Sequence, residues 1–181
     1  MGHRSADRSM SDTVTIRPAA EHEVSVVLAF IRELARYERL EHEVVATVED
    51  LRAALFGSHR YAEVVFACSG AQPVGFALFF HNFSTFLGRP GIYLEDLFVL
   101  PEARGRGIGK RLLAWLANAA LERGCGRLEW AVLDWNAPSI GFYRSLGAVP
   151  LEEWRTFRLT GAPLAQLARD EPQGPISTVV S

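Results

Sequence analysis

Glycine occupies every second position of a short segment with three basic residues, residues 104–110, that is suited to holding a phosphate group. This glycine segment follows a strand-like apolar run ended by Pro101, and it leads into a helical pattern over residues 110–123. Glycine lets the main chain approach a ligand closely, and the unpaired N–H groups at a helix start attract an anion. Arginine adds fork-shaped donors that match phosphate oxygens. The pattern predicts a site for a large phosphorylated cofactor, formed by Arg104, Gly105, Arg106, Gly107, Ile108, Gly109 and Lys110.

The spacing of the glycines excludes two common phosphate-binding loops. A P-loop needs Gly at position 104 and Ser or Thr at position 111, where this chain has Arg104 and Arg111. The dinucleotide fingerprint needs a third glycine where the chain has Lys110. The spacing that matches is R-x-x-G-x-G, at Arg104, Gly107 and Gly109. The competing interpretation is an ordinary glycine-rich turn that caps a helix.

A second motif, Trp135-Asn136-x-x-Ser-Ile-x-Phe-Tyr143, stands downstream, and the strand before the glycine segment reads Tyr-Leu-Glu-Asp-Leu-Phe-Val. Together with R-x-x-G-x-G, these stretches resemble the GNAT superfamily of acetyl-coenzyme A-dependent N-acetyltransferases. The resemblance implies an α/β fold with a mixed central β-sheet flanked by helices, acetyl-coenzyme A (acetyl-CoA) as co-substrate, and no metal. It also implies that the glycine segment holds the pyrophosphate of coenzyme A. The pantetheine arm is then expected along the strand backbone and at one side chain of the second motif, through Leu97, Phe98, Val99 and Asn136.

Two adjacent acids, Glu95 and Asp96, interrupt the apolar strand over residues 92–99. A charge inside an apolar strand is costly unless it is used or paired. Because side chains alternate along a strand, we expect Asp96 on the same face as Leu94, opposite to Glu95. Either acid is able to attract a cationic amine and to accept its proton, directly or through water; the alternative role is a structural ion pair. The resemblance implies that Glu95 lies beside the thioester, so we predict Glu95 as the catalytic base.

Tyr143 lies in a short predicted helix, residues 137–146, that Asn136 opens. Asn is a common N-cap, and aromatic residues at such spacing are most often core, so both have a purely structural interpretation. The phenol of Tyr143 nevertheless has a proton to donate, and the resemblance implies that it protonates the coenzyme A thiolate. We therefore predict Tyr143 as the general acid, placed next to the cofactor.

Further stretches narrow the resemblance to the spermidine/spermine N-acetyltransferases and their thialysine-acetylating relatives, over nearly all of residues 13–167. The resemblance implies an acid-lined amine site and a homodimer, and the predicted substrate-binding residues are Tyr37, Glu38, Glu95, Asp96, Trp135 and Trp154. The polyamine enzymes are expected to have an acid near position 84 and a Trp at position 86, where this chain has Ser84 and Phe86. A long polyamine such as spermine is therefore disfavoured against a shorter diamine or a thialysine-like amino acid. Glu38 also has an interpretation as a solvated acid at a helix end.

The apolar pattern predicts the elements that position these residues. Strands are expected at 13–17, 61–68, 73–81, 92–99 and 127–133, and again at 149 and 154–159, with a turn-rich loop over 82–91. Helices are expected at 21–37, from a capping box at 47 to about 56, at 110–123, at 137–146 and from 163. This order predicts a single GNAT domain over residues 13–170, preceded by a disordered leader, 1–12, and followed by a tail, 171–181.

Composition narrows the class of protein. The chain has 181 residues, of which 49% are hydrophobic and 22% charged, as is ordinary for one globular domain. A net charge of −2 gives no argument for a nucleic-acid or membrane partner. The five histidines do not cluster, which argues against a metal site. Cys68 and Cys125 have no redox spacing and fit small buried thiols in a reducing compartment, so we expect a cytoplasmic protein.

The residues are compatible with three functions. The first is an enzyme that moves the acetyl group to the primary amine of a small diamine, polyamine or thialysine-like amino acid, by direct attack in a ternary complex. The second is a non-catalytic acyl-CoA-binding regulatory module, which needs the glycine segment but neither Glu95 nor Tyr143. The third is a protein or peptide N-acetyltransferase, which needs an open peptide groove. Since Glu95 and Tyr143 are both present, we predict the first.

Overall fold

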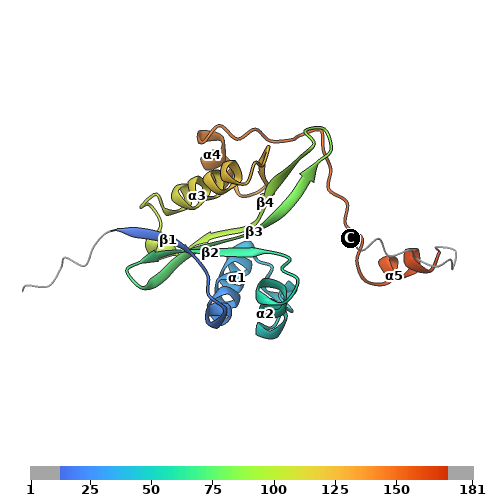
Figure 1. Ribbon diagram of the computed structural model, residues 1–181, viewed down its shortest axis with the longest axis horizontal. Helices are drawn as coiled ribbons and strands as arrows, with labels where there is room; N and C mark the ends of the chain where they lie inside the picture. The colour runs from blue at the N-terminus through green and yellow to red at the C-terminus, as the bar shows by residue number, and fades with distance from the viewer. Residues whose placement is uncertain (1–12, 171–181) are drawn as a thin grey trace, which may run out of the picture. The chain divides into compact units, whose positions relative to one another are not determined.

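The computed structural model describes residues 13–170, and contacts within the chain divide it into two units (Figure 1). The first unit ends at Val132 and the second begins at Leu133. The predicted leader, 1–12, and the predicted tail, 171–181, lie outside the described residues. The two units are taken one at a time below.

A five-stranded sheet forms the frame of the first unit. Its strands lie side by side in chain order: β1 (Val14–Pro18), β2 (Glu63–Ser69), β3 (Gln72–Ser84), β4 (Arg89–Val99) and β5 (Leu128–Trp130). The pairs from β1 to β4 are antiparallel, and β4 pairs with β5 in parallel. The predicted mixed sheet of an α/β fold is thus confirmed.

Helices cover both faces of this sheet. The helices α1 (Val24–Glu38) and α2 (Val48–Phe56) lie on one face, and α3 (Ile108–Glu122) lies on the other (Figure 1). Short 3-10 turns at Glu21–Glu23, Glu41–Glu43 and Pro101–Ala103 precede or connect them. The helices predicted for this unit are confirmed, with ends shifted by a few residues. The capping box at the start of α2 is also confirmed, with the N–H of Asp50 donating to the Thr47 hydroxyl at 3.1 Å.

Aromatic side chains fix the helices on the sheet. Phe30 of α1 stacks on Phe76 of β3, with ring centroids 5.2 Å apart, and contacts Phe66 of β2 at 5.8 Å. On the opposite face, Trp115 of α3 meets Phe79 of β3 edge-on at 6.0 Å. Phe76 and Phe79 point to opposite faces because side chains alternate along a strand. Both faces of the central strands are therefore covered, and β4 can be apolar on both sides.

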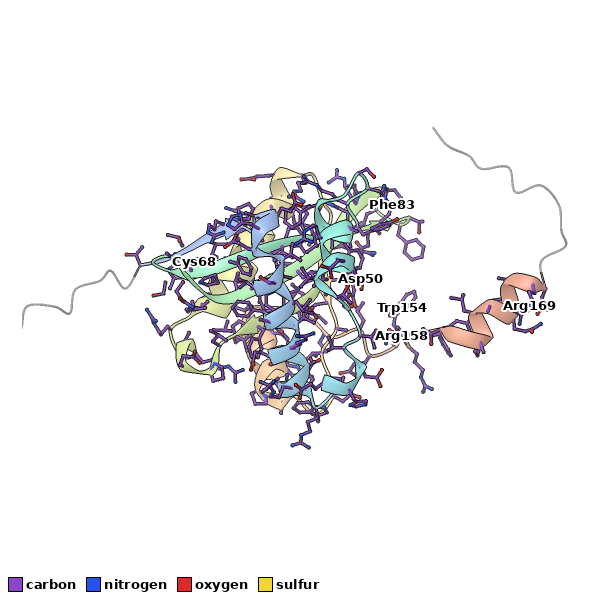
Figure 2. The ribbon with its side chains drawn as sticks, turned by 90° about the horizontal axis from the view of Figure 1, so that it is seen from below. Asp50, Cys68, Phe83, Trp154, Arg158 and Arg169 are labelled. Carbon is purple, nitrogen blue, oxygen red and sulfur yellow. The ribbon has the colours of Figure 1, made fainter. Side chains whose placement is uncertain are left out.

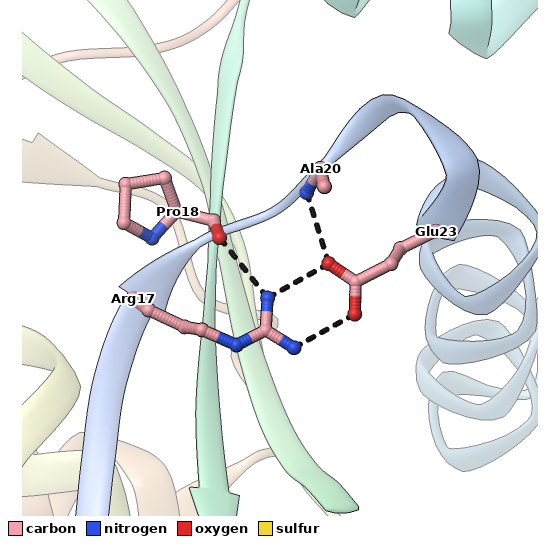
Figure 3. A network of polar contacts seen from close by, with 4 residues as sticks. All are labelled: Arg17, Pro18, Ala20 and Glu23. Atoms are coloured by element: carbon pink, nitrogen blue, oxygen red, sulfur yellow. Dashed lines mark hydrogen bonds and ion pairs between the residues drawn. The ribbon is translucent and has the colours of Figure 1, made fainter. Parts of the chain in front are cut away.

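An ion pair fastens β1 to the turn before α1 (Figure 3). Arg17 donates from two guanidinium nitrogens to the two carboxylate oxygens of Glu23, each at 2.7 Å. The backbone N–H of Ala20 donates to the same carboxylate at 2.9 Å. The bonds from Arg17 come first among the causes that lower the pKa of Glu23 to about 2. The entry angle of α1 is thereby set at its first turn, fifteen residues before the helix reaches the candidate site at Glu38.

Two predictions for the first unit were wrong at their ends. The loop predicted over 82–91 is mostly strand, because Asn82 pairs with Gly91 and Phe83 with Pro90 across the β3–β4 hairpin. Pairing with a neighbouring strand overrides the turn-forming composition of this segment. Phe83 projects from the hairpin and is 60% exposed (Figure 2). The strand predicted at 127–133 is shorter, since β5 spans only Leu128–Trp130.

The second unit contains the helices α4 (Ala137–Ser145) and α5 (Gly161–Arg169) in its described part. The strands predicted at 149 and 154–159 were wrong, because the described chain has no strand after Trp130. Trp154 and Arg158 instead project from a segment without regular structure (Figure 2). A segment with strand-forming residues becomes a strand only where a neighbouring strand takes up its backbone hydrogen bonds, and the described residues offer none here.

Candidate functional site

A β-bulge at Glu95 divides β4 into two halves. In the pairing of β3 with β4, Leu78 lies opposite Asp96 and Phe79 lies opposite Leu94, which makes Glu95 the extra residue on the β4 side. A bulge of this kind bends the strand and re-aims the side chains beyond it. Two adjacent acids therefore stand at the one place where the regular ladder between β3 and β4 is interrupted.

The bulge sends Asp96 to the face of the sheet that α1 covers. Leu78 packs against the core cluster that contains Phe30 of α1, whereas Phe79 contacts α3. Opposed residues on paired strands share a face, so Asp96 points to the α1 face and Leu94 to the α3 face. The simple alternation predicted for this strand was therefore wrong, because the extra residue changes the face of every side chain beyond it.

Beyond the bulge, one edge of β4 is open within the described chain. The parallel pairing with β5 covers Ile92, Tyr93 and Leu94 and goes no further. Main-chain N–H and C=O groups along such an edge can bind an extended ligand as an added strand would. The residues predicted to bind the pantetheine arm lie on this stretch: Leu97, Phe98 and Val99.

The glycine segment forms the start of α3. Gly105 and Gly107 have φ of 76° and 72°, in the left-handed region that disfavours other residues, and Gly107 is the N-cap of the helix. The N–H of Arg111 donates to the carbonyl of Gly107 at 3.1 Å, so the N–H groups of Ile108, Gly109 and Lys110 precede the helical ladder. A Cβ at Gly105 or Gly107 would meet no described protein atom within 4 Å, which leaves room for a ligand over the segment. These features fit a diphosphate held by main-chain donors.

The side chain of Arg104, which the sequence predicts as a phosphate donor, contacts β4 and α1 in the structure. Its Nε donates to the carbonyl of Val99 at 3.0 Å. Its guanidinium carbon lies 5.0 Å from the ring centroid of Tyr37 and 5.3 Å from that of Phe98. The two rings are themselves 6.4 Å apart. Arg104 thus joins the glycine segment, β4 and the end of α1.

Three carboxylates gather where α1 ends and β4 bulges, and we call Glu38, Glu95 and Asp96 the acid group. Burial, followed by the negative charges of Glu95 and Glu38, raises the pKa of the half-buried Asp96 to about 7. Burial also raises the pKa of Glu38, while Glu95 is exposed at the bulge. A carboxyl with a pKa near 7 can exchange a proton at neutral pH, and a cation placed among the three acids would favour their charged forms.

The remaining predicted residues belong to the second unit. Asn136 is buried and is the N-cap of α4, where its side-chain oxygen accepts from the N–H of Ser139 at 3.3 Å. The ring of Tyr143 lies 5.4 Å from that of Phe142. Trp135 and Trp154 are 53% and 73% exposed. The structural interpretation of Asn136 as an N-cap is confirmed, and its predicted contact with the cofactor stays a prediction.

Comparison with known proteins identifies the family. A model described as the acetyltransferase (GNAT) family matches residues 28–148. The chain belongs to the GNAT acetyltransferase family. It is 41% identical to a thialysine N-epsilon-acetyltransferase from Sus scrofa, over 86% of this chain and 98% of that protein. It is 32% identical to an L-ornithine N5-acetyltransferase from Arabidopsis thaliana, over 90% of this chain and 88% of that protein.

A solved structure supports the same assignment. An integron cassette protein from the mobile metagenome of V. cholerae matches this GNAT chain with a TM-score of 0.74 and 31% identity, covering 88% of this chain and 99% of the other. The predicted GNAT fold is therefore confirmed. The protein is an N-acetyltransferase of a family that uses acetyl-CoA as co-substrate.

Two features of this GNAT site escaped the reasoning from sequence. The bulge at Glu95 leaves no trace in the apolar pattern, because both faces of β4 are covered and apolar residues are expected on both. The contact of Arg104 with Tyr37 joins residues 67 positions apart, which no local spacing reveals. Two neighbouring acids inside an apolar strand were the available signal, and they marked the position of the bulge without revealing its geometry.

Other parts of this GNAT chain offer less to a ligand. Two open grooves, of about 490 and 340 Å³, contain no member of the acid group in their lining, which is Arg36, Arg39, Glu41 and His42 in the first and Ile16, Arg111, Ala114, Trp115 and Asn118 in the second. Over residues 13–170, no three His, Cys, Asp or Glu side chains stand close enough to hold a metal ion. Over the same residues, no helix is both long and apolar enough to cross a membrane.

Proposed function

We propose that this GNAT enzyme acetylates the terminal primary amine of a small lysine-like amino acid or diamine, by direct attack on acetyl-CoA in a ternary complex. The acid group is the observation that carries the proposal. It places three carboxylates beside the open edge of β4, where a positively charged amine would be attracted and a thioester would lie. Two relatives add support, since their names specify acetylation of a side-chain amine in thialysine and in ornithine.

The co-substrate would be held mainly by main-chain groups. The N–H groups from Gly105 to Lys110 would bind the pyrophosphate at the start of α3, with Arg106 and Lys110 adding positive charge. The edge of β4 at Leu97, Phe98 and Val99 would pair with the pantetheine amides, and Asn136 would bond to the same arm. This arrangement would leave the thioester at the bulge, next to Glu95.

The reaction needs one proton removed and one returned. An alkylamine with a pKa of about 10.4 is almost fully protonated near neutral pH and must lose a proton before it can attack. Glu95 would accept that proton, directly or through water. The amine nitrogen would then form a bond to the thioester carbon, the carbon–sulfur bond would break, and Tyr143 would donate its proton to the leaving thiolate.

The size of the amine follows from what lines the site. Glu38, Asp96 and Tyr37 would hold a second polar group of the substrate, and Trp135 and Trp154 would contribute contacts from the second unit. Polyamines carry several spaced charges and need as many spaced acids, but Ser84 is buried and Phe86 is 93% exposed at the positions where an acid and a Trp are expected for polyamines. A short diamine or a thialysine-like amino acid is therefore favoured over spermine.

A panel of amines tests this function. The protein is incubated with acetyl-CoA and with thialysine, ornithine, putrescine, spermidine, spermine or a lysine peptide, while free thiol release is followed. Release is expected with thialysine, ornithine or putrescine at a higher kcat/KM than with spermine. If no amine gives thiol release above the blank while coenzyme A still binds, the proposed enzymatic function is wrong and a non-catalytic regulatory module is favoured. If the lysine peptide is the best substrate, the small-amine assignment is wrong.

We further propose a cytoplasmic homodimer. Cys68 and Cys125 are free thiols in the described chain, as suits a reducing compartment. The second unit exposes Leu151, Trp154 and Phe157, which a partner chain would cover. Light scattering on the purified protein is expected to give a mass of about twice 20.1 kDa. A mass of one chain across the micromolar range would contradict the dimer.

A further inference from the structure

Arg104 makes three contacts that together occupy its side chain. Its Nε bonds to the carbonyl of Val99 at 3.0 Å, and its guanidinium carbon lies 5.0 Å from the Tyr37 ring and 5.3 Å from the Phe98 ring. A guanidinium over an aromatic face within about 6 Å is attracted by the ring quadrupole. The planar group is also able to stack on a ring, which an ammonium group cannot do. These contacts hold the side chain against β4 and α1. The guanidinium is then not directed to a phosphate as a fork-shaped donor.

Tyr37, the residue of α1 that Arg104 contacts, is next to the proposed amine site. Tyr37 is followed by Glu38, whose negative charge acts on Asp96, and Glu38 is the last residue of α1. The following residue, Arg39, has φ of 63°, which is uncommon for a residue other than glycine, and the N–H of Leu40 closes the helix on the carbonyl of Ala35 at 2.8 Å. The position of Glu38 therefore depends on how the end of α1 is held.

We propose that Arg104 is a positioning residue for the amine site: through its contacts with Tyr37 and Phe98 it holds the end of α1, and with it Glu38, against β4. The proposal rests on the proposed function for its reference to an amine. It assigns Arg104 to substrate placement instead of phosphate binding. The main-chain groups of the glycine segment, with Arg106 and Lys110, then supply the contacts to the pyrophosphate.

The contact itself can be tested without any ligand. Unfolding by denaturant is measured for Arg104→Lys, Tyr37→Leu and the double variant. Arg104→Lys keeps the charge and removes the planar stack and the Nε bond. We expect the double variant to lose clearly less unfolding free energy than the sum of the two single losses. When Tyr37→Phe replaces Tyr37→Leu, the coupling to Arg104 should be kept because the ring remains. Additive losses would overturn the proposal.

The role of the contact is read from two binding constants. With Arg104→Lys we expect the Kd for coenzyme A, from calorimetry, to stay within roughly 2-fold of wild type, and the amine KM at saturating acetyl-CoA to rise roughly 3- to 10-fold. Arg32→Lys, an exposed arginine elsewhere on α1, is the matched control and is expected to change neither value. A weakened Kd for coenzyme A with an unchanged amine KM would overturn the proposal and make Arg104 a phosphate ligand.

The two experiments separate this inference from the proposed function. If the wild-type protein turns over none of the amines, the proposed function fails, and the unfolding cycle alone decides whether Arg104 holds Tyr37. If the wild type is active and the cycle shows coupling but the amine KM of Arg104→Lys is that of wild type, the contact is structural only and the positioning role is wrong.

Discussion

The glycine segment and the acid group adjoin the same strand, and we propose that they bind groups of opposite charge. The glycine segment is exposed except at Ile108 and Gly109, and its main-chain N–H groups at the start of α3 suit an anion. The acid group is partly buried and offers carboxylates to a cation where β4 bulges beside the end of α1. One site depends on a local backbone conformation, and the other depends on how three elements pack.

This difference decides how much of each site is visible in the sequence. Left-handed glycines and a helix start are local properties, so R-x-x-G-x-G marks the first site directly. The acid group has a long-range origin, because Glu38 comes from α1 and the other two acids from β4. It should also be the more sensitive of the two to pH, because burial already displaces two of its pKa values.

The largest effect is expected from Glu95→Gln. If Glu95 is the general base, as we propose, its loss should lower kcat/KM roughly 10²- to 10⁴-fold. The Kd for coenzyme A should stay near wild type, because the glycine segment is untouched. Steady-state kinetics and calorimetry on the same preparation measure both values. Glu102→Gln, an exposed acid outside the acid group, is the matched control and is expected to have wild-type rates. Wild-type turnover in Glu95→Gln would move the base elsewhere, with Asp96 as the first candidate.

Tyr143→Phe tests the proposed proton donor, which belongs to neither the glycine segment nor the acid group. Without the phenol, the thiolate must leave unprotonated or take its proton from water, so kcat should fall roughly 10²-fold while the Kd for coenzyme A changes little. The loss should shrink for an acyl donor whose thiol has a lower pKa, because such a thiolate leaves without help. An equal loss with both donors would remove Tyr143 as the acid and leave it a packing role.

Asp96→Asn tests the burial of the acid group through stability. The folded state raises the pKa of Asp96 from 3.8 to about 7, so the native state disfavours the charged form. The favourable contribution of protonated Asp96 is therefore complete below pH 4 and is lost as pH rises through about 7. The full rise in pKa corresponds to roughly 4 kcal/mol of unfolding free energy, and partial solvent exposure reduces this value. We therefore expect Asp96→Asn to be about 2 kcal/mol more stable than wild type at pH 8.

Denaturant unfolding of both proteins at pH 4 and pH 8 measures this gain. The two proteins should differ little from each other at pH 4. An equal difference in unfolding free energy between wild type and Asp96→Asn at both pH values would show that burial does not raise the pKa of Asp96.

The elements of the first unit were predictable to the extent that their signals are local. The capping box at Thr47 and the apolar spacing of α1 each act within one turn of helix, and both elements were predicted with small errors at their ends. The hairpin strands beyond Asn82 were missed because strand pairing, which the sequence does not display, holds a segment rich in turn-forming residues. The same limit hid the face to which Asp96 points.

The second unit shows the opposite error. A strand was predicted from Trp154 to Leu159, but the described chain provides no neighbouring strand for these residues. Strand propensity describes how well side chains fit a paired surface and does not create the pair. Asn136, by contrast, was interpreted correctly as an N-cap, because capping needs only the next few residues.

A smaller effect separates backbone strain from cofactor binding in the glycine segment. Gly107→Val forces a β-branched residue to φ of 72°, and Gly70→Val forces one to φ of 61° in the β2–β3 turn. Neither added Cβ meets a described atom within 4 Å, so both variants should lose a similar amount of unfolding free energy, roughly 1–2 kcal/mol, from strain alone. Only Gly107→Val should also weaken the binding of coenzyme A, with a Kd raised roughly 10-fold or more, because it displaces the N–H groups at the start of α3. If Gly70→Val weakens coenzyme A equally, the loss reflects general destabilisation, and the start of α3 is not where the pyrophosphate binds.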